Sequence, residues 1–142
     1  MFEYLEKRKV ALVYIPLIIY WSLLLMGTSL PAPDVPSFGI GDKFTHFGAY
    51  FGLAVLLCFT FHYQNKYLFL KKFFLTSTLV VVTVYGLLDE FHQSFIPGRS
   101  SEFFDWVADV IGAAAGIIFV FYLMKILKYS PNTFTKASHS AG

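Results

Sequence analysis

Charged residues are scarce in this chain of 142 residues, and their scarcity sets its class. Asp, Glu, Lys and Arg make up 14% of the chain, whereas soluble domains contain about 25%. Hydrophobic residues make up 56% and aromatic residues 20%. A soluble domain of this size could not bury so much apolar surface. The composition therefore indicates an integral membrane protein and argues against a nucleic-acid binder or a disordered chain.

Cysteine is nearly absent as well. Cys58 is the single cysteine and lies within an apolar run, which excludes an intramolecular disulfide and a disulfide-stapled scaffold. The sequence has no HExxH, GxSxG or phosphate-loop motif, and no tandem repeat is evident. Function must therefore be inferred from where the few polar residues lie.

The sequence does contain four long apolar stretches, each near the length of about 20 residues that a membrane-spanning helix needs. They predict an all-α integral membrane bundle of four transmembrane helices, over about 10–30, 44–65, 70–90 and 105–126. We expect one membrane domain over 1–129 and a polar, disordered tail over 130–142. The alternative for the first stretch is a cleaved signal peptide. Signal cores run about 7–15 residues, so this longer stretch favours a retained helix.

Lysine and arginine are unevenly divided between the two sides of the predicted bundle. One side has a net charge of +7, with Glu3 and Glu6 as its acids. Its basic residues are Lys7, Arg8, Lys9, Lys66, Lys71, Lys72, Lys125, Lys128 and Lys136. The other side has a net charge of −5, with Lys43 and Arg99 as its basic residues. Because cytoplasmic loops are enriched in Lys and Arg, both termini are predicted to be cytoplasmic.

Ionisable residues gather at the outer ends of the second, third and fourth predicted helices. Spacings of three or four residues place several on common helix faces: Asp42 with His46, Asp89 with His92 and Gln93, and Asp105 with Asp109. Asp42 and Asp105 could instead be helix caps or partners of the helix dipole.

Three of these acidic residues are expected to have a nearby partner. Asp109 lies one turn inside its helix, where an unpaired carboxylate is costly, so we expect it to point towards His46 or Arg99, or to be protonated. Asp89 and Glu90 are unfavourable at a helix C-terminus and should have a partner such as Lys43 or Arg99.

Such a cluster can support three kinds of chemistry. Arg99 and Lys43 can bind an anionic head group. His46 and a carboxylate can perform acid–base catalysis. Asp, Glu and His side chains can hold a divalent cation, but no spacing here is a metal signature, so the sequence names no cofactor.

Three segments of the outer side resemble motifs of VanZ-like membrane proteins. Residues 42–50 (DKFTHFGAY) resemble a DKxxHxxxY motif, and residues 89–99 (DEFHQSFIPGR) resemble DExxQxxxPGR. Residues 105–112 (DWVADVIG) resemble the DxxxNxxG element that follows, with Asp109 where the family usually has Asn. The resemblance covers about 42–116. The matching residues are Asp42, Lys43, His46, Asp89, Glu90, Gln93, Arg99 and Asp105.

The resemblance implies a multi-pass protein of the bacterial cytoplasmic membrane with an envelope role, of the type that reduces susceptibility to the glycopeptide teicoplanin. We expect an outward-facing polar site that binds or modifies a lipid, a lipid-linked cell-wall intermediate or a lipophilic glycopeptide. If the site is catalytic, His46 is the general acid or base and Asp42 or Asp89 orients it. The expected ligand-binding residues are Lys43, Glu90, Gln93, Arg99, Asp105 and Asp109.

Two other functions remain open at this point. One is a small transporter or proton relay with Asp109 and His46 along its path. The third and fourth predicted helices are largely apolar in their cytoplasmic halves, which argues against a polar path through the membrane. The other is a non-catalytic scaffold for an envelope enzyme. The expected partner is the lipid bilayer rather than nucleic acid, and the sequence does not give the oligomeric state.

Overall fold

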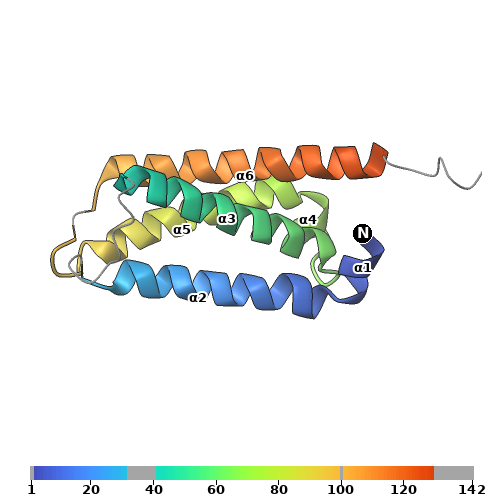
Figure 1. The fold of residues 1–142 in the computed structure, drawn as a ribbon, viewed down its shortest axis with the longest axis horizontal. Coiled ribbons are helices and arrows are strands. Elements are labelled where there is room, and N and C mark those ends of the chain that lie inside the picture. The colour runs from blue at the N-terminus through green and yellow to red at the C-terminus, as the bar shows by residue number, and fades with distance from the viewer. Residues whose placement is uncertain (1, 32–40, 100, 130–142) are drawn as a thin grey trace, which may run out of the picture.

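The computed structural model describes residues 2–31, 41–99 and 101–129 (Figure 1). The described residues form helices only, which confirms the predicted all-α fold. The elements are α1 (Phe2–Lys7), η1 (Val10–Tyr14), α2 (Ile15–Ser29), α3 (Asp42–Tyr63), α4 (Leu68–Lys72), α5 (Phe74–Gln93) and α6 (Phe103–Tyr129). Four stretches in this part are long and apolar enough to cross a membrane, as predicted. They are Val10–Ser29, Lys43–Tyr63, Phe74–Gln93 and Phe103–Leu127.

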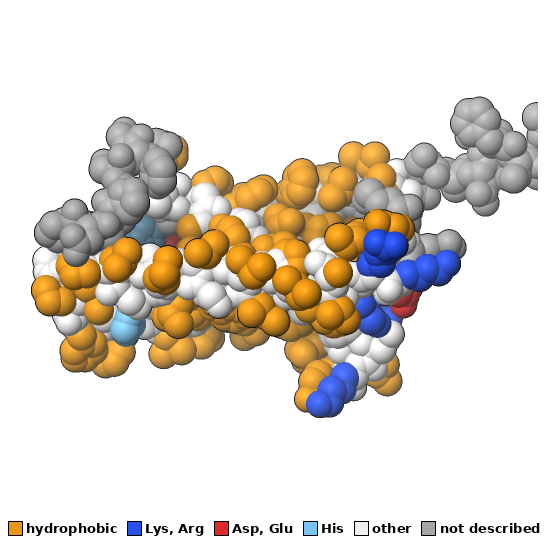
Figure 2. Space-filling model, turned by 60° about the horizontal axis from the view of Figure 1, so that its bottom comes forward, with side chains coloured by type: hydrophobic (Ala, Val, Ile, Leu, Met, Phe, Trp, Pro, Cys, Tyr) orange, Lys and Arg blue, Asp and Glu red, His pale blue; other side chains and the backbone are white. Residues whose placement is uncertain are grey.

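The four long helices run side by side, and their outer sides are apolar (Figures 1 and 2). Figure 2 shows hydrophobic side chains covering the length of the bundle on one face. Many hydrophobic side chains of the long helices, such as Ile18, Val80 and Ile118, are more than half exposed. In water this surface would be costly, and in a bilayer it faces hydrocarbon of similar polarity.

Helices α3 and α6 share the largest interface of the described part, and glycine makes it possible. A Cβ atom at Gly112 would collide with the backbone carbonyl of Phe47, and one at Gly116 would lie 2.6 Å from the Phe51 carbonyl oxygen. Gly112 and Gly116 lie four residues apart on one face of α6, and this pair of small residues serves packing within the chain. Gly48 makes no comparable contact and lies exposed on α3.

Helix α2 is attached to the other three mainly through side chains. The Tyr20 hydroxyl donates to the Ala49 carbonyl oxygen of α3 at 2.8 Å. Ser29 Oγ lies 3.1 Å from His92 Nε2 of α5. Within the described part of α2, Leu17 is its one buried residue, so α2 is the least embedded of the four long helices.

Helix boundaries differ from the sequence prediction at the third span. The prediction started this helix at 70, but Phe73 has φ −111° and ψ 35° and separates α4 from α5. The helix also continues three residues beyond Glu90, to Gln93. Asp89, Glu90 and Gln93 all lie on its buried face, so the acids do not mark its exit into water. In the first span, η1 is π-helical just before Pro16, whose ring nitrogen cannot donate to the Leu12 carbonyl.

The first described residues and the end of α6 lie at the same end of the bundle (Figure 1). Basic side chains gather at this end in Figure 2. Helices α1 and α4, which lie at this end in Figure 1, carry Lys7 and the pair Lys71 and Lys72 in their last turns. The predicted polar tail over 130–142 and the loop over 32–40 lie outside the described residues. At the opposite end of the bundle, three helices meet around a buried polar group.

Candidate functional site

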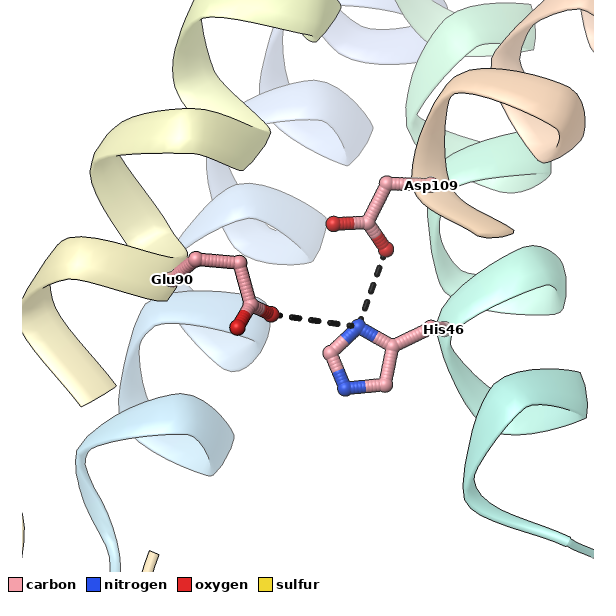
Figure 3. A group of neighbouring side chains, drawn as sticks. All are labelled: His46, Glu90 and Asp109. Atoms are coloured by element: carbon pink, nitrogen blue, oxygen red, sulfur yellow. Dashed lines mark hydrogen bonds and ion pairs between the residues drawn. The ribbon is translucent and has the colours of Figure 1, made fainter. Parts of the chain in front are cut away.

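Three helices each contribute one ionisable side chain to a buried group, which we call the His46 cluster: His46 of α3, Glu90 of α5 and Asp109 of α6. His46 Nδ1 lies 2.9 Å from Asp109 Oδ1 and 3.9 Å from Glu90 Oε1 (Figure 3). The residues are 7%, 5% and 0% exposed, respectively. The short contact with Asp109 fixes the plane of the imidazole ring and turns its Nδ1 edge towards both carboxylates (Figure 3).

The carboxylates of the cluster are only partly hydrogen-bonded. Glu90 Oε2 accepts a hydrogen bond from the backbone N–H of Glu102 at 3.1 Å, which holds Oε1 towards His46. Within the described part of the chain, Glu90 Oε1 and Asp109 Oδ2 are buried without a hydrogen-bond partner. Such atoms are rare in folded proteins, because burying an unsatisfied oxygen costs about 1–3 kcal/mol.

A second polar chain runs beside the cluster. The Tyr50 hydroxyl donates to Asp89 Oδ2 at 3.2 Å, and Gln93 Nε2 donates to the same oxygen at 3.1 Å. Arg99 Nη1 then donates to Gln93 Oε1 at 3.1 Å. Arg99 thus reaches the Asp89 carboxylate only through the amide of Gln93.

The position of Arg99 depends on a tight turn after α5. The Arg99 N–H donates to the Ile96 carbonyl at 3.1 Å, with Pro97 and Gly98 between them. Gly98 has φ 77°, which a glycine adopts without steric cost. Proline followed by a glycine of positive φ is typical of a type II turn. The turn directs the guanidinium to the end of α2, where it donates to the carbonyls of Gly27 at 2.8 Å and Leu30 at 3.3 Å.

Lys43 lies outside both groups. Its Nζ is 3.0 Å from Asp105 Oδ1 and 3.1 Å from Glu102 Oε2, so it ties the start of α3 to the start of α6. Asp105 is buried and lies in the first turn of α6, where the helix dipole also favours a carboxylate. The positive charge of Lys43 is thus balanced by these two acids.

A cavity of about 270 Å³ lies between α2 and α3 next to the cluster. We call it the α2–α3 cavity. Its lining residues are Tyr20, Leu23, Leu24, Gly27, Thr28, Thr45, His46, Ala49, Tyr50 and Arg99. Leucine and alanine side chains supply an apolar wall, and His46, Tyr50 and Arg99 supply polar groups. This is the usual composition of a small-molecule pocket.

Comparison with known proteins agrees with the motifs in these helices. The family model described as VanZ/LLP1 matches residues 4–127 and so includes all four long helices. The chain belongs to the VanZ/LLP1 family. An uncharacterised protein of the fission yeast Schizosaccharomyces pombe is 29% identical over 113 residues, which cover 79% of this chain and 62% of the yeast protein. This chain therefore spans less than two thirds of that relative. No solved structure matches it significantly.

The structure unites most of the VanZ-like motif residues and separates others. His46, Glu90 and Asp109 meet in the cluster, and Asp89, Gln93 and Arg99 form the neighbouring chain. The contact of Asp109 with His46 is one of the two, to His46 or to Arg99, that the cost of an unpaired carboxylate predicted. Lys43 and Asp105 pair with each other at the edge of the site. Asp42 is the first residue of α3, but its side chain lies outside the described residues.

Two expectations need correction within the described residues. Lys43 and Arg99 are not the partners of Asp89 and Glu90: Lys43 contacts Glu102 and Asp105, and Arg99 contacts Gln93 and backbone carbonyls. Asp109 contacts His46 in the place expected of Asp89, which instead accepts from Tyr50. Residue spacing gives the face of a helix, whereas the rotation of one helix against another decides which faces meet.

Tyr50 is a VanZ/LLP1 residue that the sequence analysis did not place in the site. It is 1% exposed, lines the α2–α3 cavity and bonds Asp89. Tyr50 follows His46 by four residues and so lies on the same face of α3, and this spacing could have placed it in the site. The contribution of the Gly27 carbonyl could not be inferred, because no side chain marks it.

Proposed function

We propose that this VanZ/LLP1 protein binds an amphiphile with an acidic head group in the α2–α3 cavity. Lipids, lipid-linked cell-wall intermediates and lipophilic glycopeptides such as teicoplanin belong to this chemical class. The observation that carries the proposal is the cavity itself, in which an apolar wall from α2 ends at Arg99, His46 and Tyr50. An acyl segment packs against the wall, and the head group meets the polar end.

Arg99 has the capacity to bind an anion while keeping its structural contacts. A guanidinium carries five N–H groups, and the hydrogen bonds of Arg99 to described residues occupy one on each nitrogen. One N–H on each of Nη1 and Nη2 remains, in the fork that suits phosphate and carboxylate. Lys43 has no such role in this proposal, because it pairs with Asp105 and Glu102 away from the cavity.

The size of the cavity limits how the ligand is held. Small-molecule pockets usually measure about 300–1,000 Å³, and this cavity of about 270 Å³ is slightly smaller. It therefore takes the head group and the adjoining part of one chain, while the remainder of the ligand stays in the bilayer. If the ligand is modified, His46 is the general acid or base, and Asp109 orients it through the 2.9 Å contact.

We propose further that the His46 end of the bundle faces away from the cytoplasm, because lysine and arginine gather at the opposite end. The bacterial cytoplasmic membrane remains a prediction, since the VanZ/LLP1 relative described above is a yeast protein.

The cavity can be tested by filling it. The full chain is purified in detergent, incubated with phosphatidylglycerol or phosphatidylcholine and examined by native mass spectrometry. We expect the wild-type chain to retain phosphatidylglycerol in preference to phosphatidylcholine. Leu24→Trp, which fills the cavity, should lose this retention. Leu25→Trp is the matched control, because Leu25 is 50% exposed on the same helix.

Equal retention by wild type and Leu24→Trp would contradict the proposal. A transporter would instead carry its substrate across reconstituted vesicles, and a scaffold would show neither lipid retention nor transport.

A further inference from the structure

The His46 cluster has the composition of a metal site, and its members come from three different helices. One imidazole nitrogen and two carboxylate oxygens lie within 4.8 Å of one another at His46, Glu90 and Asp109. In Figure 3 both carboxylates face the Nδ1 edge of the imidazole. A single atom placed between the three side chains would be close to all of them.

Unsatisfied oxygens of the cluster point to a missing partner. Glu90 Oε1 lies on the His46 side of its carboxylate and accepts no hydrogen bond from the described residues. Asp109 Oδ2 is likewise unpartnered and faces α5, where a Cβ at Gly86 would lie 3.1 Å from it. Both residues are more than nine-tenths buried. The fold thus holds two carboxylate oxygens ready without supplying donors for them.

The charge around the cluster leads to the same conclusion. Among the described residues, no lysine or arginine forms an ion pair with Glu90 or Asp109, because Lys43 and Arg99 have the other partners given above. Two ionised carboxylates and a neutral imidazole carry a charge of −2, which is costly away from water. One divalent cation balances this charge and gives Glu90 Oε1 a partner.

We propose that His46, Glu90 and Asp109 bind a divalent first-row transition-metal ion, Zn²⁺ or Mn²⁺. Imidazole favours such ions, and carboxylates suit Zn²⁺ and Mn²⁺. Ca²⁺ prefers six to eight oxygen ligands, and Mg²⁺ keeps most of its waters. Ligands at about 2.0–2.2 Å from Zn²⁺ lie roughly 3.3 Å apart. The contacts of 2.9 and 3.9 Å are close to this spacing, and the two carboxylate oxygens lie no more than 4.8 Å apart.

Three protein ligands leave coordination positions open, as in catalytic zinc sites rather than structural ones. Of the three residues, His46 also lines the α2–α3 cavity. The ion thus sits on the Nδ1 side of the ring, next to the cavity but not within its lining. This inference goes beyond lipid binding and does not depend on it, because metal binding is measured without any lipid ligand.

The test uses the full, untagged chain in detergent, stripped with EDTA and dialysed against Zn²⁺, Mn²⁺, Mg²⁺ or Ca²⁺. Bound metal is measured by inductively coupled plasma mass spectrometry and affinity by competition with a chromogenic chelator. We expect about one Zn²⁺ or Mn²⁺ per chain, and binding at least about tenfold weaker in Glu90→Gln and Asp109→Asn. Both substitutions keep side-chain volume, and circular dichroism verifies that each variant is folded.

Glu102→Gln is the matched control. It removes one negative charge from the same end of the bundle but keeps the backbone N–H that binds Glu90. This variant should bind metal like wild type, and Zn²⁺ should raise the melting temperature of wild type but not of Glu90→Gln. The proposal is overturned if folded wild type binds no more metal than Glu90→Gln, or if it prefers Mg²⁺ or Ca²⁺. Retention of phosphatidylglycerol by the same metal-free protein would then leave the lipid proposal standing.

Discussion

Arg99 donates a hydrogen bond from Nη2 to the carbonyl oxygen of Gly27, 2.8 Å away, and so joins the turn after α5 to the last turns of α2. Its Nε and Nη1 atoms bond Leu30 and Gln93 at the same time. Arg99 therefore holds one wall of the α2–α3 cavity in addition to lining it.

Replacing Arg99 by lysine should loosen the end of α2 while the chain still folds. Lysine cannot reproduce the planar fork, and each lost hydrogen bond costs about 0.5–1.5 kcal/mol. In Arg99→Lys we expect faster hydrogen exchange at the α2 amides near Gly27, unchanged exchange in α6, and loss of phosphatidylglycerol retention. Arg8→Lys, at the opposite end of the bundle, is the control. If the amides near Gly27 exchanged at the same rate in Arg99→Lys as in wild type, the hydrogen bonds of Arg99 would not be what holds the end of α2.

Asp109 should require an oxygen acceptor more than a charge when no metal is present. With EDTA present, Asp109→Asn keeps a carbonyl oxygen for His46 Nδ1–H, and we expect its stability to change by less than about 1 kcal/mol. Asp109→Leu leaves a buried imidazole donor without this acceptor, which costs about 1–3 kcal/mol. Thermal unfolding in detergent measures both variants. If the leucine variant were as stable as wild type, the His46 contact would contribute nothing to the fold.

Gly112→Ala should strongly destabilise the bundle, because the added methyl group would collide with the Phe47 carbonyl and separate α3 from α6. Overpacking of this kind costs about 1–3 kcal/mol. Gly48→Ala makes the same chemical change at an exposed position of α3, where no described atom of another helix lies within 4 Å of the new carbon. There, alanine should be neutral or stabilising, since it favours a helix over glycine by about 1 kcal/mol. Equal melting temperatures for the two variants would refute the close approach of α3 and α6.

The orientation of the bundle can be tested by cysteine labelling. Cys58 is buried, so the native chain should react little with a membrane-impermeant maleimide. We expect Ser101→Cys to be labelled from outside intact cells and Asn65→Cys to be labelled only after lysis. Both positions are exposed, so a difference reports the side of the membrane. Labelling in the reverse order would place the His46 cluster on the cytoplasmic side.

The sequence was sufficient to predict the four helices, because long runs without charge have few other structural explanations in a chain of this composition. It could not locate the break at Phe73, since no glycine or proline marks it and the backbone angles there depend on packing. The predicted helix ended at residue 90, because Asp89 and Glu90 indicated the membrane surface. Both residues are instead buried, and α5 continues to Gln93.

For the site, spacing within α5 correctly grouped Asp89 with Gln93, which hydrogen-bond each other, but not His92, which is exposed and lies beside Ser29 of α2. The cost of an isolated carboxylate inside a helix predicted that Asp109 points towards His46 or Arg99, and its partner is His46. The sequence could not show that Lys43 pairs with Glu102, or that Arg99 bonds two backbone carbonyls. Those contacts join positions 59 to 72 residues apart, and they depend on how the helices are rotated about their axes.

The close approach at Gly112 also sets the separation of the two atoms at the centre of the site. Phe47 directly follows His46, and Gly112 lies one turn after Asp109, so the backbones touch beside the 2.9 Å contact. The distance between imidazole and carboxylate is thus fixed by main chain rather than by flexible side chains. Because α2 takes no part in this contact, a change in the tilt of α2 would leave the spacing of His46 and Asp109 unaltered.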